Sequence, residues 1–348
     1  MDLGKKDVSF RFVPYGTVFE PRPNALVLDV GMKTLPGVID HHHPEAAPEC
    51  TASLIAKQPS LVLEHIPAET PGPLTIITHR LPDFDATASA FLALKLLETR
   101  STDDAIETLA AYAKRADAAT LPKTWDLAST PYAILRSLFH RIRKPEDIAN
   151  LERMREGLRM MSFLYDRVRE GHDITQNRGL FSGIDRYGRA IRRAEADYFA
   201  YLDDLEKAEK LTLKLPQTSG RGTRTVDGLV VRNPRSYLLK EWARRDRTHP
   251  SLGKGFSFVM TNFGNTRYIL GVDPEAGVHL KGLGDMLNAR EAAKREAEGR
   301  AFPRLWFDGN APFFNFRIID SPQDGTVLSH REIVETLKEF SRGCSPKR

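Results

Sequence analysis

The stretch PLTIITHRLPDFDATASAFLALKLLETR, Pro73 to Arg100, joins an apolar, β-branched run to a helical pattern through a turn that contains proline. Its first part, PLTIITH, is typical of a strand buried in a parallel sheet, and its second part, ATASAFLALKLLETR, of a helix packed on that sheet. Two strand-like runs precede it, ALVLDVG (Ala25 to Gly31) and PGVID (Pro36 to Asp40), and the runs TASLIAKQ and DDAIETLAAYAKRAD also have helical spacing. This alternation predicts an α/β fold with a parallel sheet flanked by helices, which binds ligands beyond the carboxyl ends of its strands.

The chain of 348 residues is longer than one hydrophobic core usually serves, so two domains are expected. We predict an α/β domain over residues 1–180, a helical connector over 181–215 and a smaller α/β domain over 216–348. The connector depends on a charged run with an apolar stripe, Ile184 to Lys214, before the polar segment PQTSGRGTRT. The elements expected after it are strand DGLVV, helix SYLLKEWARR, hairpin FSFVMTN and TRYILGV, helix LKGLGDMLNAREAAKREAEG, strand NFRIID and a final helix from His330 to Phe340.

Composition places the chain among globular proteins, with 41% hydrophobic and 28% charged residues. It contains no apolar run near the ~20 residues of a membrane span, and its start, MDLGKKDVSF, lacks the apolar core of a secretory signal. We therefore predict a cytoplasmic protein with no membrane association. Cys50 and Cys344 are too few and too far apart for a disulfide framework or a cysteine-based zinc site. The net charge of +5 favours anionic partners only weakly.

Carboxylates and imidazoles follow three of the predicted strands. One aspartate ends the first strand, the stretch VIDHHHPEA follows the second, and THRLPDFDA follows the third. Taken singly, each group has another explanation, such as a helix-capping aspartate, a solvated histidine loop or a capping turn. Together at the strand ends of one sheet, they indicate a site for divalent first-row metals. The candidate residues are Asp29, Asp40, His41, His42, His43, His79, Asp83 and Asp85.

VIDHHH and THRLPDFDATASA together resemble the motifs of the DHH phosphoesterase superfamily. That superfamily includes single-strand exonucleases, oligoribonucleases, cyclic dinucleotide phosphodiesterases, inorganic pyrophosphatases and exopolyphosphatases. Its H-x-x-x-D-x-D motif, followed by a helix rich in small residues, matches His79, Asp83 and Asp85. Its strand-ending aspartate matches Asp29, and its Asp-His-His triplet matches the stretch VIDHHH.

The order of the motifs in this chain differs from that in the usual members of the superfamily. The H-x-x-x-D-x-D motif comes first in the usual members, whereas here Asp29 and the Asp-His-His triplet precede it, as a circular permutation of the sheet would produce. A fourth family motif is a further aspartate, for which Asp117 in LAAYAKRAD is the best match. Asp103, Asp104 and Asp126 are its competitors.

The resemblance implies a hydrolase with two Mn²⁺ ions, with Co²⁺ or Mg²⁺ as alternatives, which activate a water for attack on phosphorus. Asp40 and His42 would be its catalytic residues outside the metal ligands. The resemblance implies that Asp29 and Asp117 bridge both ions, that His79 and Asp83 complete one ion site, and that Asp85 and His41 complete the other. Asp40 would orient an imidazole, and His42 would contact the phosphoryl group or the leaving oxygen. The resemblance implies no role for His43.

The expected substrate is a phosphodiester of a nucleotide or short oligonucleotide. The alternatives are inorganic pyrophosphate or polyphosphate, and a catalytically silent nucleotide-binding module. Arg232 and Arg235 are predicted to bind substrate phosphates, although the basic run that contains them equally fits a solvated face. That run is Arg221, Arg224, Arg232, Arg235 and Lys240. The oligomeric state is left open.

The last domain resembles, more faintly, the smaller α/β domain that follows DHH domains and closes over their substrate. The Gly-Gly-Gly-His loop common there is missing, and LWFDGNAPFF, Leu305 to Phe314, stands in the corresponding place. A plain turn at Asp308 and Gly309 is the alternative explanation of this stretch. Its aromatic residues can stack on bases but are more often part of a core. They are Trp306, Phe307, Phe313 and Phe314.

Overall fold

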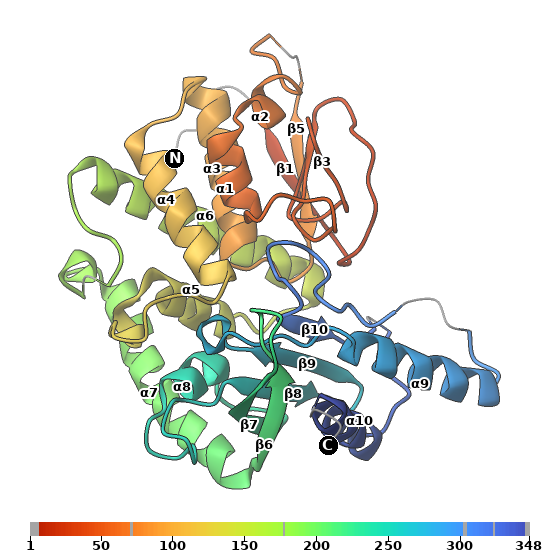
Figure 1. Cartoon of the computed structure of the whole chain (residues 1–348). Coiled ribbons are helices and arrows are strands. Elements are labelled where there is room, and N and C mark those ends of the chain that lie inside the picture. The colour runs from red at the N-terminus through yellow and green to blue at the C-terminus, as the bar shows by residue number, and fades with distance from the viewer. Residues whose placement is uncertain (1–6, 70–71, 177, 302–304, 323, 345–348) are drawn as a thin grey trace. The chain divides into compact units, whose positions relative to one another are not determined.

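The computed structural model divides into two compact units, each built from a five-stranded sheet and helices (Figure 1). The α/β fold class predicted from the sequence is confirmed. Unit 1 contains residues 1–195 with 311–313, and unit 2 contains residues 196–310 with 314–348. The described residues are 7–69, 72–176, 178–301, 305–322 and 324–344.

The division between the units falls inside helix α7 (Asp185–Lys207), between Glu195 and Ala196. The predicted connector, residues 181–215, therefore contains this helix. The prediction that the chain starts without a secretory signal depends in part on residues 1–6, which lie outside the described residues. Within the described ranges, no helix combines the length and the apolar composition needed to cross a lipid bilayer.

The sheet of unit 1 has the strand order β1-β5-β2-β4-β3. Four of its strands run parallel, and only β3 is antiparallel to its neighbour. The carboxyl ends of β1, β5, β2 and β4 therefore lie at one edge of the sheet, which we call the ligand edge. The sequence predicted three of these strands and missed β1 and β3. Their bounds are β1 (Val8–Val13), β2 (Ala25–Leu28), β3 (Thr34–Leu35), β4 (Val38–Ile39) and β5 (Leu74–His79).

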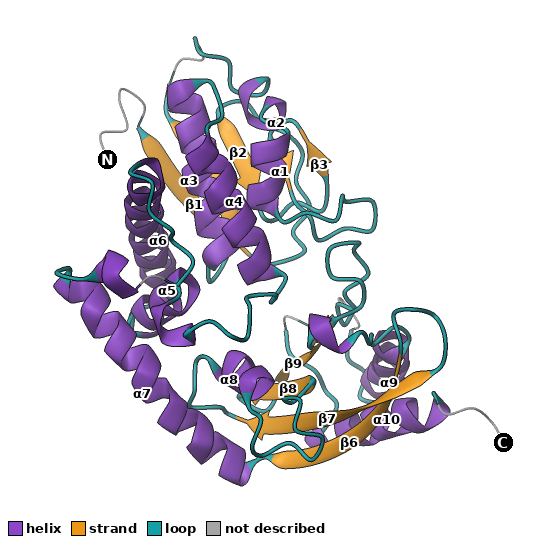
Figure 2. Cartoon of the chain, turned by 60° about the vertical axis from the view of Figure 1, so that its left-hand side comes forward, coloured by secondary structure: helices purple, strands orange, loops and turns teal. Residues whose placement is uncertain are grey.

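Helix α3 lies at the centre of the helical layer that covers one face of this sheet (Figure 2). It packs on β2 and β5 and also on α1, α4 and α6. Small residues permit this crowding, because Ala86, Ala88 and Ala90 are fully buried. At Gly157 of α6, an added Cβ would lie 2.3 Å from the methyl group of Thr87, so glycine is required there. The helices are α1 (Thr51–Lys57), α2 (Ser60–Leu63), α3 (Phe84–Thr99), α4 (Asp104–Asp117), α5 (Pro131–His140) and α6 (Glu146–Arg169).

The opposite face of the sheet is covered by a loop. Val13, Val27, Val38 and Ile77 form a buried apolar cluster with Phe19, which lies on the segment between β1 and β2. Strand residues next to these in sequence point to the other face, as the two-residue period of a strand requires. The connection from β1 to β2 therefore crosses the face that has no helical layer.

Unit 2 has a sheet of order β10-β9-β8-β7-β6, in which only β7 and β8 are parallel. The predicted helix from Ile184 to Lys214 is wrong at its end, because α7 stops at Lys207 and Glu209 begins β6. In EKLTLKLP the leucines recur every second residue, which is a strand period. The elements are β6 (Glu209–Pro216), β7 (Thr223–Arg232), α8 (Leu239–Arg245), β8 (Phe258–Phe263), β9 (Arg267–Val272), α9 (Leu283–Ala297), β10 (Ile318–Asp320) and α10 (His330–Gly343).

The stretch LWFDGNAPFF contains a required turn and a core residue. Gly309 has φ 66°, and an added Cβ would lie 2.6 Å from the carbonyl oxygen of Ile318. Asp308 accepts a hydrogen bond from the backbone N–H of Asn310 at 3.0 Å, as in an Asx turn. Trp306 is buried in the core of unit 2. Turn and core packing thus account for Asp308, Gly309 and Trp306.

Glu49, two residues before α1, forms ion pairs with a lysine of α1 and a lysine of α4. Its carboxylate lies 2.8 Å from the ammonium of Lys114 and also contacts Lys57. Burial alone would raise the pKa of Glu49, but these hydrogen bonds lower it from 4.5 to about 2. A carboxylate with a lowered pKa stabilises the fold above its unfolded pKa, and this contribution is lost as the pH falls toward the folded value.

Glu49→Gln is therefore expected to lower the free energy of unfolding at pH 7 by about 1 kcal/mol. The difference from the unmodified protein should shrink as the pH falls from 4.5 toward about 2, since the charge is lost there. Urea unfolding across this pH range measures both effects. Glu45→Gln, at an exposed position nearby, is the matched control and should change nothing. A Glu49 effect that is independent of pH would contradict an electrostatic origin.

Candidate metal centre

Three groups of carboxylates and imidazoles lie at the ligand edge of the unit 1 sheet. Within each group, one potential ligand atom per residue lies within 4.8 Å of the others, so each group can hold a metal ion. Asp29 belongs to two groups, and so does His41. The groups are Asp29, Asp40, His41 and His42; Asp29, His79 and Asp83; and His41, Asp85 and Asp117.

Asp29 stands at the centre of this arrangement because β2 ends next to it. Its backbone N–H still donates to the Ile39 carbonyl of β4 at 2.9 Å, and its φ of 60° turns the chain away from the sheet. Aspartate adopts this left-handed conformation more readily than most residues. Its two carboxylate oxygens lie 3.3 Å from His41 Nδ1 and 3.2 Å from His79 Nε2. The side chain therefore connects imidazoles from two strand ends.

The tautomer of His79 is set by its backbone neighbour. Its Nδ1 lies 2.8 Å from the Arg80 carbonyl oxygen, which only accepts hydrogen bonds, so Nδ1 carries the proton. Its Nε2 faces the carboxylates of Asp29 and Asp83, at 3.2 and 3.9 Å. Asp83 also caps α3, because it accepts a hydrogen bond from Ala86 N–H at 3.0 Å. This side of the site presents one imidazole and two carboxylates.

Thr51, at the start of α1, sets the tautomer of His41. Its hydroxyl donates to Asp29 at 3.1 Å, so toward His41 Nδ1, also at 3.1 Å, it accepts. His41 Nε2 faces Asp117, whose carboxylate oxygen is 3.2 Å away. The carboxylate of Asp85 accepts hydrogen bonds from the backbone N–H groups of Thr51 and Ala52, at 2.9 and 3.1 Å. Thus α1 orients two candidate ligands, and Thr51 was not predicted from the sequence.

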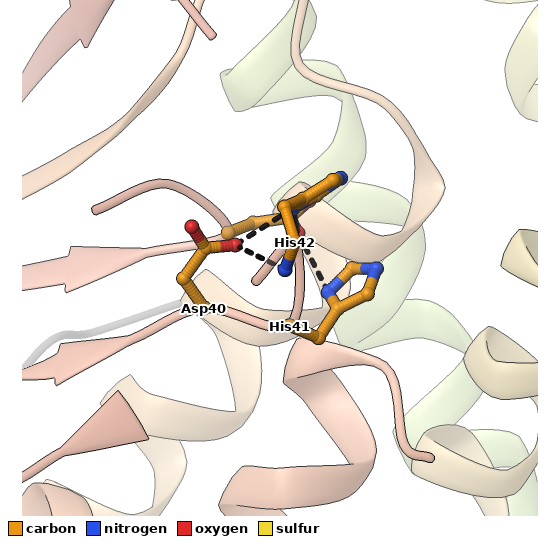
Figure 3. A group of neighbouring side chains, drawn as sticks. Asp40, His41 and His42 are labelled. Atoms are coloured by element: carbon orange, nitrogen blue, oxygen red, sulfur yellow. Dashed lines mark hydrogen bonds and ion pairs between the residues drawn. The ribbon is translucent and has the colours of Figure 1, made fainter. Parts of the chain in front are cut away.

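Asp40 orients His42, as Figure 3 shows. One Asp40 oxygen lies 2.7 Å from His42 Nδ1 and also accepts the His42 backbone N–H, and the other accepts the Met32 N–H at 2.7 Å. The His42 side chain is 18% exposed, whereas those of His41 and His79 are buried at 1% and 0%. Among these three histidines, His42 is the accessible one.

Asp117 is the aspartate that the fold brings to the site, because it is the last residue of α4 and α4 packs against α1. Its competitors lie elsewhere: Asp103 and Asp104 are at the other end of this helix, and Asp126 pairs with Arg178 at 3.0 Å. Two carboxylates were predicted to bridge both ions. Asp117 groups with His41 and Asp85 alone, so only Asp29 is shared with the His79 side.

Opposite charges and burial set the protonation of the cluster. Burial alone would raise the pKa of Asp29, but His41 and His79 hold it well below its usual range. For His79 the signs are reversed, because burial alone would lower its pKa. Asp29 instead raises the pKa of His79 to about 9. The pKa of Asp85 is well above its ordinary value because of burial and of the negative charges of Asp29 and Asp117. The cluster thus concentrates acidic groups that repel one another in the absence of cations.

His43, Arg232 and Arg235 belong to none of the three ligand groups. His43, which had no predicted role, lies 3.1 Å from the Thr34 hydroxyl through Nε2. Arg232 and Arg235 belong to unit 2, at the end of β7 and just beyond it, and Arg235 pairs with Asp203 at 3.0 Å. Their binding of substrate phosphates stays a prediction.

Neither a scan against models of protein families nor a search of curated proteins gives a match for this chain.

Proposed function

We propose that this chain is a metal-dependent phosphoester hydrolase that cleaves a phosphodiester of a nucleotide or short oligonucleotide. The observation that supports it most is the gathering of three imidazole and carboxylate groups at the ends of parallel strands. Mixed imidazole and carboxylate ligands suit Mn²⁺ or Co²⁺ better than Mg²⁺. The resemblance to DHH phosphoesterases supports the reaction class.

The charge of the cluster also fits divalent cations. Asp85 is buried beside the carboxylates of Asp29 and Asp117, and their repulsion is one reason why its pKa is raised. Cations bound among these oxygens would remove that repulsion. His41 and His79 would contribute Nε2, since their Nδ1 protons are donated to a hydroxyl and a carbonyl oxygen. Two ions held in this way would supply a water of lowered pKa and neutralise phosphoryl oxygens.

His42 is the residue that we place against the substrate. Its Nδ1–H donates to Asp40, which holds the ring in one orientation. Its Nε2 is then able to donate a proton to the leaving oxygen, as a general acid does. Asp40 acts through His42 and is therefore a positioning residue.

Hydrolysis of bis-p-nitrophenyl phosphate tests the proposal. The protein is expected to bind about two Mn²⁺ ions, to require Mn²⁺ or Co²⁺ for turnover, and to lose all activity in excess EDTA. Metal analysis after dialysis and release of p-nitrophenolate give the two measurements. Full activity in excess chelator would overturn the proposal. A panel of dinucleotides, cyclic dinucleotides, pyrophosphate and polyphosphate then identifies the substrate class.

A further inference from the structure

Tyr15 lies beside the candidate metal centre, on the turn that follows β1. Because β1 pairs in parallel with β5, with Val13 opposite His79, the turn after β1 comes next to a candidate ligand. The Pro14 carbonyl closes this turn, accepting hydrogen bonds from the backbone N–H of Thr17 at 3.3 Å and its hydroxyl at 2.6 Å. Tyr15 is therefore held at the ligand edge by the sheet and by its own turn.

The Tyr15 ring stacks on His79. The two ring centroids are 4.0 Å apart with an angle of 21° between the planes, and the hydroxyl lies 3.0 Å from His79 Nε2. The edge of His42 also approaches the Tyr15 ring, at 5.7 Å and 67°. Tyr15 thus contacts histidines of two ligand groups.

Tyr15 is also exposed, although the histidine under it is buried. Its exposure is 41%, against 0% for His79. Two more exposed apolar residues lie on the loops that follow β1 and β5: Val18 at 64% and Leu81 at 53%. We call Tyr15, Val18 and Leu81 the apolar rim. An apolar rim beside charged ligands suits a substrate with a phosphoryl group and a planar, apolar part.

We propose that the Tyr15 ring is the stacking platform for the nucleobase of a substrate whose phosphoryl group reaches the candidate metal centre. This inference rests on the proposed function and deepens it. Stacking on an aromatic ring tolerates any base and needs no hydroxyl group. Pyrophosphate and polyphosphate have no planar part, so the platform favours nucleotide esters over inorganic phosphoanhydrides.

The test compares Tyr15→Leu, which removes the ring, with Tyr15→Phe, which keeps it. Equilibrium dialysis of the Mn²⁺-loaded full chain gives the Kd of adenosine 5′-monophosphate and of inorganic phosphate. Tyr15→Leu is expected to weaken nucleotide binding about tenfold, within the range of base stacking, and to change phosphate binding less than about twofold. Tyr15→Phe should match the unmodified protein with both ligands. Phe199→Leu, which removes an exposed aromatic ring on α7 outside the apolar rim, is the matched control.

The outcomes separate this inference from the proposed function. Equal weakening of both ligands by Tyr15→Leu would show that Tyr15 only supports His79, and an equal loss in Tyr15→Phe would assign the effect to the hydroxyl. Either result overturns the platform and leaves the hydrolase proposal standing, as does a nucleotide that binds the unmodified protein no better than phosphate. An unmodified protein that binds neither Mn²⁺ nor phosphate overturns both.

Discussion

Replacing Asp29 by asparagine is expected to weaken Mn²⁺ binding by more than about 100-fold and to abolish turnover. Asp29 belongs to two of the three ligand groups, so the change removes ligand charge from both sides of the centre. Asparagine has the same shape and also tolerates the left-handed backbone found at this position, where φ is 60°. The loss is therefore chemical and not conformational.

Metal titration by calorimetry and metal analysis after dialysis measure the Asp29 effect. Asp104→Asn is the matched control, because it makes the same chemical change at an exposed position at the far end of α4. It should bind metal as the unmodified protein does. An Asp29→Asn protein that retains two ions would remove Asp29 from the centre and contradict the two-metal assignment.

His42→Ala is expected to keep both metals and lose about 10² to 10⁴ in kcat, the usual contribution of a general acid. The physical reason is position: His42 is the accessible histidine, and Asp40 fixes its Nδ1. His41 and His79 are buried, with Nε2 facing carboxylates. Removing His42 should therefore affect the transition state more than the bound ions.

Kinetics beside metal content distinguish this role from that of a ligand. His172→Ala, at an exposed histidine far along the chain, is the control and should alter neither quantity. If His42→Ala strips metal as completely as Asp29→Asn does, His42 is itself a ligand. The geometry permits that result, because His42 Nδ1 lies 3.8 Å from an Asp29 oxygen and the two residues belong to one ligand group.

Local sequence determined the main parts of unit 1. Apolar, β-branched runs predicted β2, β4 and β5, and helical spacing predicted α1, α3 and α4. Parallel strands put their carboxyl ends at one edge, so the sequence alone predicts that Asp29, Asp40 and His79 lie near one another. This worked because strand and helix periods, and the residues that end them, are encoded within a few positions.

The local sequence pattern does not predict strands β1 and β6. β1 alternates partly buried and exposed residues at the edge of the sheet, and its pattern VSFRFV was not recognised. β6 follows the charged helix α7 so closely that, in the sequence, its leucines extend the apolar stripe of that helix. β1 is completed by a partner distant in sequence, β5. β6 instead pairs with β7 across the short loop of residues 217–222.

Packing between distant segments decided the rest of the site. The 14 residues of α4 carry aspartates at both ends, about 20 Å apart at the rise of an α-helix, and only its packing against α1 brings Asp117 to the ligand edge. Thr51 and Tyr15 gave no signal because a threonine at a helix start and a tyrosine after a strand are ordinary residues. The sequence thus determined which residues end the strands. The tertiary structure decided which side chains of other elements meet them, since those contacts join positions far apart along the chain.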